Sequence, residues 1–252
     1  MSAPTSGVVV TGGGSGIGRA TALLLAEAGR PVAVWDLDGA NAEATAKEAA
    51  DRHGVAAVGR GLDVTDTASF DAAIAQARDA IGPIGGLVHA AGVGVAVPVP
   101  FLDEAQWDAV LDVNLRAEAL LVKALLPSFR EVGAGAAVVG ISSVEALIGS
   151  GMLPAYCSSK AGLLGLTRSM AHAFGPEGLR VNAVCPGAVD TPMLAPLLNV
   201  PGARERLSER IPMRRVAQPE DIGRVVRFLL SDDAAYVTGT YVVVDGGMTA
   251  AM

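Results

Sequence analysis

Short runs of β-branched residues alternate with longer alanine- and leucine-rich stretches along this chain. The short runs are predicted strands, and most are continuously apolar, which is typical of a parallel sheet covered on both faces. Strand–helix alternation of this kind predicts an α/β fold of the doubly wound Rossmann type, with a seven-stranded parallel sheet and helices on both faces. The predicted strands are Val8–Val10, Pro31–Trp35, Val55–Leu62, Leu87–Ala90, Ala136–Ile141, Arg180–Val184 and Tyr241–Val244.

The longer stretches are predicted helices, several of which end at a glycine. They are Ala20–Ala28, Asn41–His53, Ala68–Ile81, Glu104–Leu126, Ala155–Phe174 and Asp221–Leu230. Pro127 is expected to end or kink the fourth of these helices, because proline removes a backbone donor. No linker or repeat interrupts the pattern, so residues 1–252 are predicted to form a single domain.

The composition excludes several classes of function. Apolar residues make up 51% of the 252 residues, enough for a sizeable core, and only 18% are charged. The net charge of −7 argues against nucleic acid or an anionic membrane as the main partner. No apolar stretch is long enough to span a membrane, no secretory signal is visible, and two cysteines cannot make a disulfide framework. A cytoplasmic protein is expected.

A glycine-rich loop, Thr11–Gly18, lies between the first predicted strand and the first predicted helix. Backbone amides of such a loop can approach a pyrophosphate, and the following helix N-terminus favours negative charge. The glycines follow the pattern GxxxGxG rather than GxGxxG, and no Walker A lysine follows them. An ordinary glycine-rich turn is the alternative. The residues expected to contact a dinucleotide here are Gly12, Ser15, Gly16, Ile17 and Gly18.

Asp36 lies at the end of the second predicted strand, 18 residues after Gly18. A carboxylate there can accept hydrogen bonds from the adenosine ribose hydroxyls and would repel a 2′-phosphate. The pattern therefore predicts NAD rather than NADP as the cofactor, with the neighbouring Leu37 also in contact. Arg19 is the counter-evidence, but it follows the loop and is expected on the helix. A solvated turn aspartate is the alternative for Asp36.

Tyr156 and Lys160 are four residues apart, hence on one face of a predicted helix, and Ser143 precedes Tyr156 by 13 residues. Together with the glycine loop, these residues resemble the short-chain dehydrogenase/reductase family, classical type. The resemblance covers essentially the whole chain. Its matching segments are Thr11–Gly18, Asp63, Ala90–Gly92, Asn114, Ser143, Tyr156–Lys160, Pro186-Gly187 and Asp245-Gly246.

The resemblance implies an oxidoreductase that interconverts a secondary alcohol and a ketone by hydride transfer. Tyr156 is then the general acid/base, and Lys160, as a nearby ammonium, lowers the pKa of that tyrosine and holds the nicotinamide ribose. Ser143 would hydrogen-bond the substrate oxygen, and Asn114 would anchor a water in a proton relay from Lys160. The structural alternatives are a buried tyrosine, a surface lysine and a helix-surface amide.

Further cofactor contacts follow from the same resemblance. Asp63 and Val64 would flank the adenine. The segment after the fourth strand would contact the cofactor through its backbone, since it has His89 and Ala90 where the family often has asparagines. Thr191 would bond the nicotinamide carboxamide, cap a helix, or do both. The remaining expected contacts are Ala90, Ala91, Gly92, Pro186, Gly187 and Val189.

Residues 190–215 lie where the family places a mobile substrate lid. Apolar residues there and in Val93–Leu102 predict a substrate with apolar surface. Hydroxysteroids, 3-oxoacyl thioesters, sugar-derived alcohols and cyclic alcohols are candidates. Packing of these residues on one another or on a partner subunit is the alternative. Glu145 falls near the expected pocket, where it contacts a polar substrate group or is a loop charge.

A homotetramer is expected from the resemblance and from two long predicted helices, whose small residues Ala161, Gly162 and Gly165 would permit close helix approach. A protein that binds and senses NAD without chemistry is the main alternative function. Another is epimerisation or dehydration, although such relatives usually have longer chains. The three histidines show no metal-ligand spacing, so they are interpreted as structural and no metal is expected.

Overall fold

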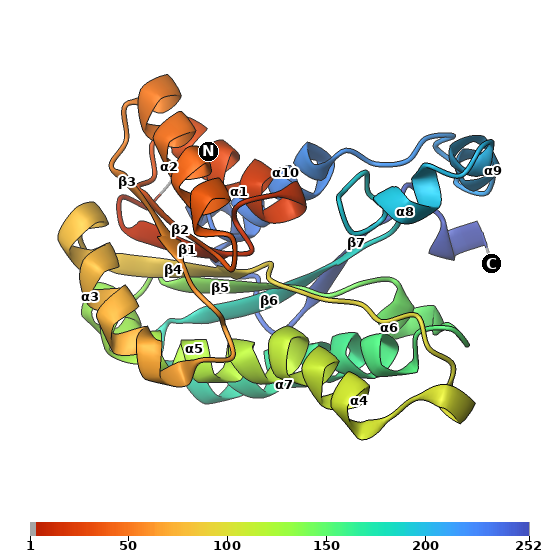
Figure 1. Ribbon diagram of the computed structural model, residues 1–252. Coiled ribbons are helices and arrows are strands. Elements are labelled where there is room, and N and C mark those ends of the chain that lie inside the picture. Colours follow the sequence, from red (N-terminus) through yellow and green to blue (C-terminus); the bar gives the residue numbers. More distant parts are fainter. Residues whose placement is uncertain (1–3, 252) are drawn as a thin grey trace.

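The computed structural model of the chain describes residues 4–251. Seven parallel strands form one sheet in the order β3-β2-β1-β4-β5-β6-β7 (Figure 1). They are β1 (Gly7–Thr11), β2 (Val32–Asp36), β3 (Ala57–Gly61), β4 (Ile84–His89), β5 (Ala137–Ile141), β6 (Arg180–Pro186) and β7 (Tyr241–Val244). The strand order reverses beside β1, because β2 and β4 flank it on opposite sides. The predicted doubly wound Rossmann fold is confirmed, and its switch point lies between β1 and β4.

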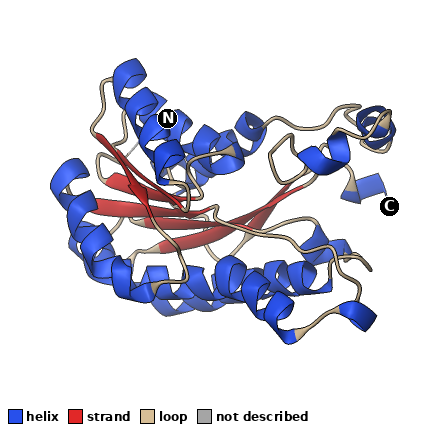
Figure 2. Ribbon diagram, in the orientation of Figure 1, coloured by secondary structure: helices blue, strands red, loops and turns tan. Residues whose placement is uncertain are grey.

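Helices cover both faces of the sheet (Figure 2). One layer consists of α1 (Gly16–Glu27), α2 (Gly39–His53) and α10 (Pro219–Leu229). The opposite layer consists of α3 (Phe70–Ile81), α5 (Ala117–Val132), α7 (Pro154–Phe174) and α4 (Glu104–Leu111), which packs on α7. Three short helices lie toward one end of the molecule, α6 (Glu145–Ile148), α8 (Ala195–Leu198) and α9 (Ala203–Glu209). Single 3₁₀ turns occur at Thr67–Ser69, Val99–Phe101, Gly175–Glu177, Asp232–Ala234 and Thr249–Ala251.

Two apolar cores hold these layers to the sheet. Successive residues of a strand point to opposite faces, so Val9 packs with Leu121 in one core while Val10 packs with Leu25 in the other. Each fully buried side chain of this size contributes about 1.5–3 kcal/mol. Both faces of the central strands are therefore occupied, and only their ends are available to a ligand.

The predicted helix Glu104–Leu126 is helical throughout, but its middle departs from α-helical geometry. It consists of α4, a π-helical segment at Asp112–Arg116, and α5, which continues past Pro127 to Val132. The expectation that Pro127 ends the helix is therefore wrong. Leu125 and Phe129, on either side of it, are buried, and their burial offsets the backbone hydrogen bond that proline cannot make.

Candidate active site

The loops that follow β1, β4, β5 and β6 meet at one edge of the sheet, because the carboxyl ends of parallel strands share an edge. Backbone hydrogen bonds join neighbouring loops. The Ala90 amide donates to the Thr11 carbonyl at 3.2 Å, and the Val144 amide donates to the Pro186 carbonyl at 2.9 Å. Predicted site residues from distant parts of the sequence are thus held side by side.

Tyr156, Ser143 and Lys160 lie together at this edge. Ser143 follows the end of β5, whereas the other two residues come from the first turns of α7. The Tyr156 phenol is hydrogen-bonded with the Ser143 hydroxyl. The Lys160 ammonium lies 5.6 Å from the centroid of the Tyr156 ring. A proton donor, its hydrogen-bonding partner and a cation are therefore assembled at one place.

The pKa of the Tyr156 phenol is raised above its ordinary value. Burial is the main cause, the Glu145 carboxylate adds to it, and the Ser143 hydrogen bond opposes it. The prediction that Lys160 lowers this pKa is wrong for the free protein. The reason is geometric, because the Lys160 ammonium donates to the Ile141 carbonyl at 2.7 Å. Tyr156 is accordingly a phenol at neutral pH in the free protein.

Lys160 is only 4% exposed, although the structural alternative was a surface lysine. Burial lowers its pKa to about 8, and the nearby carboxyl of Glu118 acts in the opposite direction. Lysines are almost never buried without a partner or a function. The buried ammonium therefore marks this position as part of the site.

Asn114 lies in the π-helical segment and is fully buried. Its side-chain oxygen accepts from the Val93 amide at 2.8 Å, and its side-chain nitrogen donates to the Val93 carbonyl at 2.9 Å and to Ser159 Oγ at 3.0 Å. The alternative of a helix-surface amide is excluded. Both amide protons are used by the protein, so this side chain fixes the segment after β4 onto α7. A relay water on Asn114 stays a prediction.

Two glycines shape the loop after β1. Gly12 has a φ of 62°, and a Cβ there would lie 2.7 Å from the Ala91 nitrogen. Gly16 has a φ of 50°, and a Cβ there would lie 3.3 Å from the Thr191 side chain. Only glycine fits both positions without strain. The loop is thus a tight backbone cradle, which suits a pyrophosphate bound through amides.

Asp36 is part of this cradle rather than an ordinary solvated turn residue. Its carboxylate accepts from the Gly14 amide at 2.8 Å and from the Asp38 amide at 3.0 Å. Leu37 beside it is 77% exposed and offers an apolar surface to a planar ring. Arg19 lies on α1, as expected, and forms an ion pair with Glu48 of α2. These features fit an adenosine with free ribose hydroxyls.

The remaining predicted contacts lie around the same edge. Asp63 accepts from the amide and hydroxyl of Thr65 at 2.8 and 2.7 Å, and Val64 is buried. The Thr191 hydroxyl donates to the Val189 carbonyl at 3.3 Å, while α8 begins only at residue 195, so the helix-cap alternative for Thr191 is wrong. Ala90, Ala91, Gly92, Pro186 and Gly187 lie in the loops that follow β4 and β6.

Sequence reasoning missed two buried groups next to the site. His89 was expected to be structural, but its bridging position was not foreseen: its ring nitrogens lie 3.0 Å from Thr11 Oγ1 and 3.0 Å from the Val113 carbonyl. Burial lowers its pKa to about 4, so the ring is neutral. Glu118 is fully buried near Lys160, and its only sequence signal is a position four residues after Asn114 on the same helical face.

The segment expected to form a lid contains α8 and α9. Met193 and Leu197 are 54% and 51% exposed, so apolar side chains face outward there. An ion pair of 2.7 Å between Arg204 and Asp190 connects α9 with the loop after β6. Glu145 begins α6 two residues after Ser143, and burial raises the pKa of its carboxyl.

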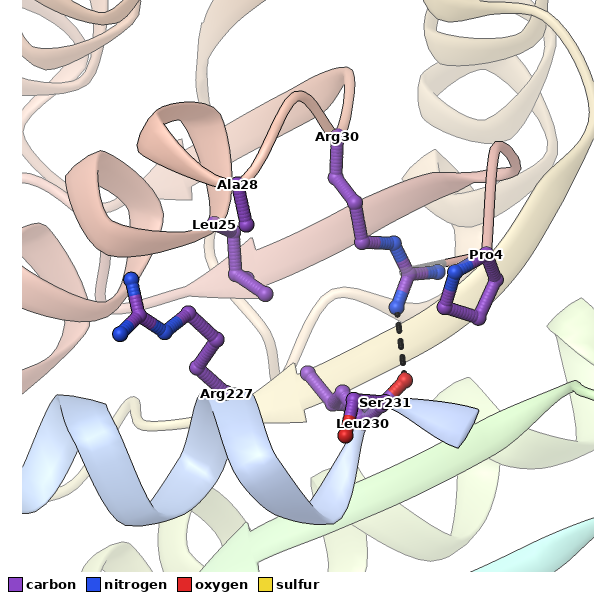
Figure 3. A pocket seen from close by; sticks show the side chains of 7 residues that line it. All are labelled: Pro4, Leu25, Ala28, Arg30, Arg227, Leu230 and Ser231. Carbon is purple, nitrogen blue, oxygen red and sulfur yellow. Dashed lines mark hydrogen bonds between the residues drawn. The ribbon is translucent and has the colours of Figure 1, made fainter. Parts of the chain in front are cut away.

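A separate cavity of about 240 Å³ lies away from this edge, where α1 ends and α10 ends (Figure 3). Its lining residues are Pro4, Leu25, Ala28, Arg30, Arg227, Leu230 and Ser231. The Arg30 guanidinium donates to the carbonyls of Ser6 and Leu230, so it ties the chain before β1 to the end of α10. This cavity is a structural junction without catalytic groups.

Within residues 4–251 no cluster of side chains suits a metal ion, and no helix is long and apolar enough to cross a membrane.

Comparison with known proteins gives consistent matches. A sequence profile of the family described as enoyl-(acyl carrier protein) reductase matches residues 12–249. The chain is 42% identical to 2-(S)-hydroxypropyl-CoM dehydrogenase 3 of Xanthobacter autotrophicus over 247 residues, which cover 96% of each chain. It is 40% identical to cis-4-hydroxycyclohexanecarboxylate dehydrogenase of Sinomonas cyclohexanicum, with 96% of each chain covered.

The fold has close matches among solved structures as well. The crystal structure of a short-chain dehydrogenase/reductase of the glucose/ribitol dehydrogenase type from Brucella melitensis superposes with a TM-score of 0.89 at 29% sequence identity. The match covers 98% of this chain and 99% of that one. The arrangement of strands, loops and helices around the site is thus shared with this protein along nearly the whole chain.

Proposed function

The chain belongs to the short-chain dehydrogenase/reductase family, and on this premise we propose that it is an NAD-dependent dehydrogenase that interconverts a secondary alcohol and a ketone. As a member of the family it is an oxidoreductase that uses a nicotinamide cofactor. The observation that carries the finer proposal is the meeting of Tyr156, Ser143 and Lys160 at the carboxyl edge of the sheet.

The proposed chemistry divides between the cofactor and the protein. A bound nicotinamide supplies the two-electron acceptor or donor at the carbinol carbon. Tyr156 moves the proton on the substrate oxygen, as base in oxidation and as acid in reduction. Ser143, which already bonds the phenol, holds the substrate oxygen beside it. Lys160 places a positive charge beside the Tyr156 ring and is available to the nicotinamide ribose.

The cradle around Gly12 and Asp36 supports NAD as the cofactor. The Asp36 carboxylate is fixed by two backbone amides and keeps lone pairs for ribose hydroxyls. A 2′-phosphate would meet this negative charge, and Arg19, the cation that follows the glycine loop, is paired with Glu48. The cofactor contacts assigned to Asp63, Val64, Val189 and Thr191 belong to the same proposal.

The substrate is proposed to carry apolar surface. Exposed Met193 and Leu197 and the segment after β4 provide apolar side chains near the site. The similar proteins named above act, by their names, on hydroxypropyl-CoM and on hydroxycyclohexanecarboxylate, which are both hydroxyl compounds, the first with a short chain and the second with a ring. A cyclic or short-chain secondary alcohol is therefore the first substrate class to test, ahead of hydroxysteroids and 3-oxoacyl thioesters.

Assembly and location complete the proposal. Ala161 and Gly165 are exposed four residues apart on α7, which supports pairing of this helix with a second copy in a homotetramer. Gly162 does not contribute to such a surface, because a Cβ there would lie 2.8 Å from Leu115 of the same chain. Cys157 and Cys185 are both free thiols, which supports a cytoplasmic enzyme.

A steady-state assay with a panel of secondary alcohols and ketones tests the proposed function. The wild-type protein is expected to turn over at least one cyclic or short-chain alcohol with NAD and to reduce the matching ketone with NADH. Binding of NAD without turnover of any compound would favour the alternative of an NAD sensor. Isomerisation or loss of water without net change in NADH would favour an epimerase or dehydratase.

A further inference from the structure

A buried carboxyl group without a hydrogen-bond partner lies beside the proposed active site. Glu118 of α5 is 0% exposed, and neither of its carboxylate oxygens is hydrogen-bonded. Among residues 4–251 it is the only acidic residue in the buried class. Acidic side chains are almost never fully buried unless paired, because an isolated charge is strongly destabilised in a protein interior. The position of Glu118 therefore calls for an electrostatic partner.

Glu118 faces the strand that also holds Lys160. Its carboxylate packs against Gly140 of β5, where an added Cβ would lie 2.5 and 2.9 Å from the two oxygens. The carbonyl of the next residue, Ile141, accepts the hydrogen bond from the Lys160 ammonium at 2.7 Å. The Glu118 carboxylate and the Lys160 ammonium thus contact consecutive residues of β5, Gly140 and Ile141, in the protein interior. Little water screens the attraction between the two groups there.

Among residues 4–251, few titratable groups act on this pair. Lys160 is the one ionised group that acts on Glu118. The titratable neighbours of Lys160 are His89 on β4, Cys185 on β6 and Tyr156 on α7. Burial lowers the pKa of His89 to about 4 and raises those of Cys185 and Tyr156, so all three are neutral near pH 7. Burial raises the pKa of Glu118 itself to about 8, and the Lys160 ammonium opposes that rise, so the two groups titrate in the same range. Among residues 4–251, Glu118 is the only carboxyl group that acts on the lysine.

We propose that Glu118 is the buried counter-charge of Lys160 and a positioning residue that keeps this lysine protonated in the active site. Glu118 does not reach the substrate, and it acts through the lysine alone. The proposal rests on the proposed function for the role of Lys160 in turnover, whereas the coupling between the two side chains exists in the free protein. Removing the carboxylate then leaves burial unopposed, and the lysine loses its proton at lower pH.

Nuclear magnetic resonance of the lysine side chains measures this coupling directly. The chain has three lysines, Lys47, Lys123 and Lys160, so selective ¹³Cε-lysine labelling gives three resolvable signals, and a K160M variant assigns the third. In E118Q the titration midpoint of Lys160 is expected to move at least about one pH unit lower than in wild type. E131Q is the matched control, because Glu131 is an exposed glutamate of the same helix.

E118L is the second variant, since it removes the charge and leaves an apolar side chain where E118Q leaves an unpartnered amide. Thermal melts establish that each variant is folded. A Lys160 midpoint unchanged in either folded variant would overturn the proposal, because a merely structural glutamate alters stability without altering the lysine. A shift of the same size in E131Q would overturn it as well.

Kinetics provide the second readout. The ratio of E118Q to wild-type kcat/KM for alcohol oxidation is expected to fall about tenfold between pH 6.5 and pH 8.5, as the variant lysine loses its charge first. A pH-independent ratio alongside a shifted Lys160 midpoint would overturn the positioning role. Absence of turnover in the wild-type protein would instead contradict the proposed function, and the titration would still decide the coupling.

Discussion

Burial acts in opposite directions on the two central residues of the site. It raises the pKa of Tyr156 and lowers that of Lys160 to about 8, because in each case the charged form is the one that loses water. The free protein therefore holds the transferable proton on the phenol. This state is the acid needed for ketone reduction, whereas alcohol oxidation first requires the phenolate.

The two reaction directions should consequently differ in their pH dependence. A base with a raised pKa is deprotonated only at alkaline pH, so kcat/KM for alcohol oxidation is expected to rise from about pH 6 to pH 8 and to level off above that, as Lys160 loses its proton. An acid with the same pKa stays protonated over this range, so kcat/KM for reduction should not rise with it. Pre-steady-state or initial-rate profiles in both directions check this. An oxidation rate that falls steadily above neutral pH would contradict the protonation state assigned to Tyr156.

The second prediction at the scale of residues concerns Asp36 and the preference for NAD over NADP. Hydrogen bonds with a charged group contribute about 1.5–3 kcal/mol, and 1.4 kcal/mol is tenfold in affinity. Wild type is therefore expected to prefer NAD over NADP by about 10–100-fold or more in kcat/KM, and D36A to lose most of that preference. D38N is the control, since it removes a charge two residues away while asparagine can still cap α2. Equal use of both cofactors by wild type would refute the assignment.

At the scale of elements, the sequence predicts the strands well and the region around Asn114 poorly. Continuous apolar runs identify the strands, because burial on both faces leaves no other pattern. The π-helical segment at Asp112–Arg116 has no such signature, since it depends on Asn114 reaching Val93 and Ser159 from other elements. The burial of Glu118 is likewise a tertiary effect. The spacing of Ser143, Tyr156 and Lys160 is visible in the sequence. The burial of Glu118 near Lys160 is not, because it depends on how distant elements pack.

The glycine loop provides a matched pair of variants at this scale. Gly12 and Gly29 have φ values of 62° and 81°, but a Cβ at Gly12 would collide with the Ala90–Ala91 backbone, whereas at Gly29 it meets nothing within 4 Å. In G12A the Kd for NAD is expected to rise tenfold or more, because the loop must open to make room for the added Cβ. A tenfold change in Kd corresponds to about 1.4 kcal/mol, which is a modest steric strain.

G29A carries the same backbone strain without the collision, so it should lower the melting temperature while the Kd for NAD remains within about twofold of wild type. Isothermal titration of NAD into both variants makes the comparison. Comparable affinity in G12A and wild type would show that the close approach of the loop to Ala91 is not needed for the cofactor.

The whole molecule presents apolar surface that a single chain does not cover. Tyr241 and Val243 of the edge strand β7 are 40% and 37% exposed, and the small residues Ala161 and Gly165 are exposed on α7. Exposed strand edges and apolar patches are usually protected by association. A homotetramer with two kinds of two-fold interface would cover both regions.

Sedimentation equilibrium at micromolar concentration tests the assembly. The wild-type chain of 25.4 kDa is expected to sediment as a tetramer, and G165E as a smaller species, because the glutamate would place a charge on the outer face of α7. Gly165 has open space around it within the chain, so the substitution should leave the fold intact. A monomeric wild type would refute the homotetramer.

The central claim is that the Tyr156 hydroxyl moves the proton in the reaction, and the most direct measurement compares kcat in Y156F and wild type with the best substrate of the panel. General acid/base catalysis contributes about 10²–10⁴-fold, so Y156F is expected to lose at least that factor while its Kd for NAD stays nearly unchanged. Tyr236 is fully exposed, and Y236F serves as the control with wild-type kcat. A Y156F variant that keeps kcat within a few-fold of wild type would contradict the account.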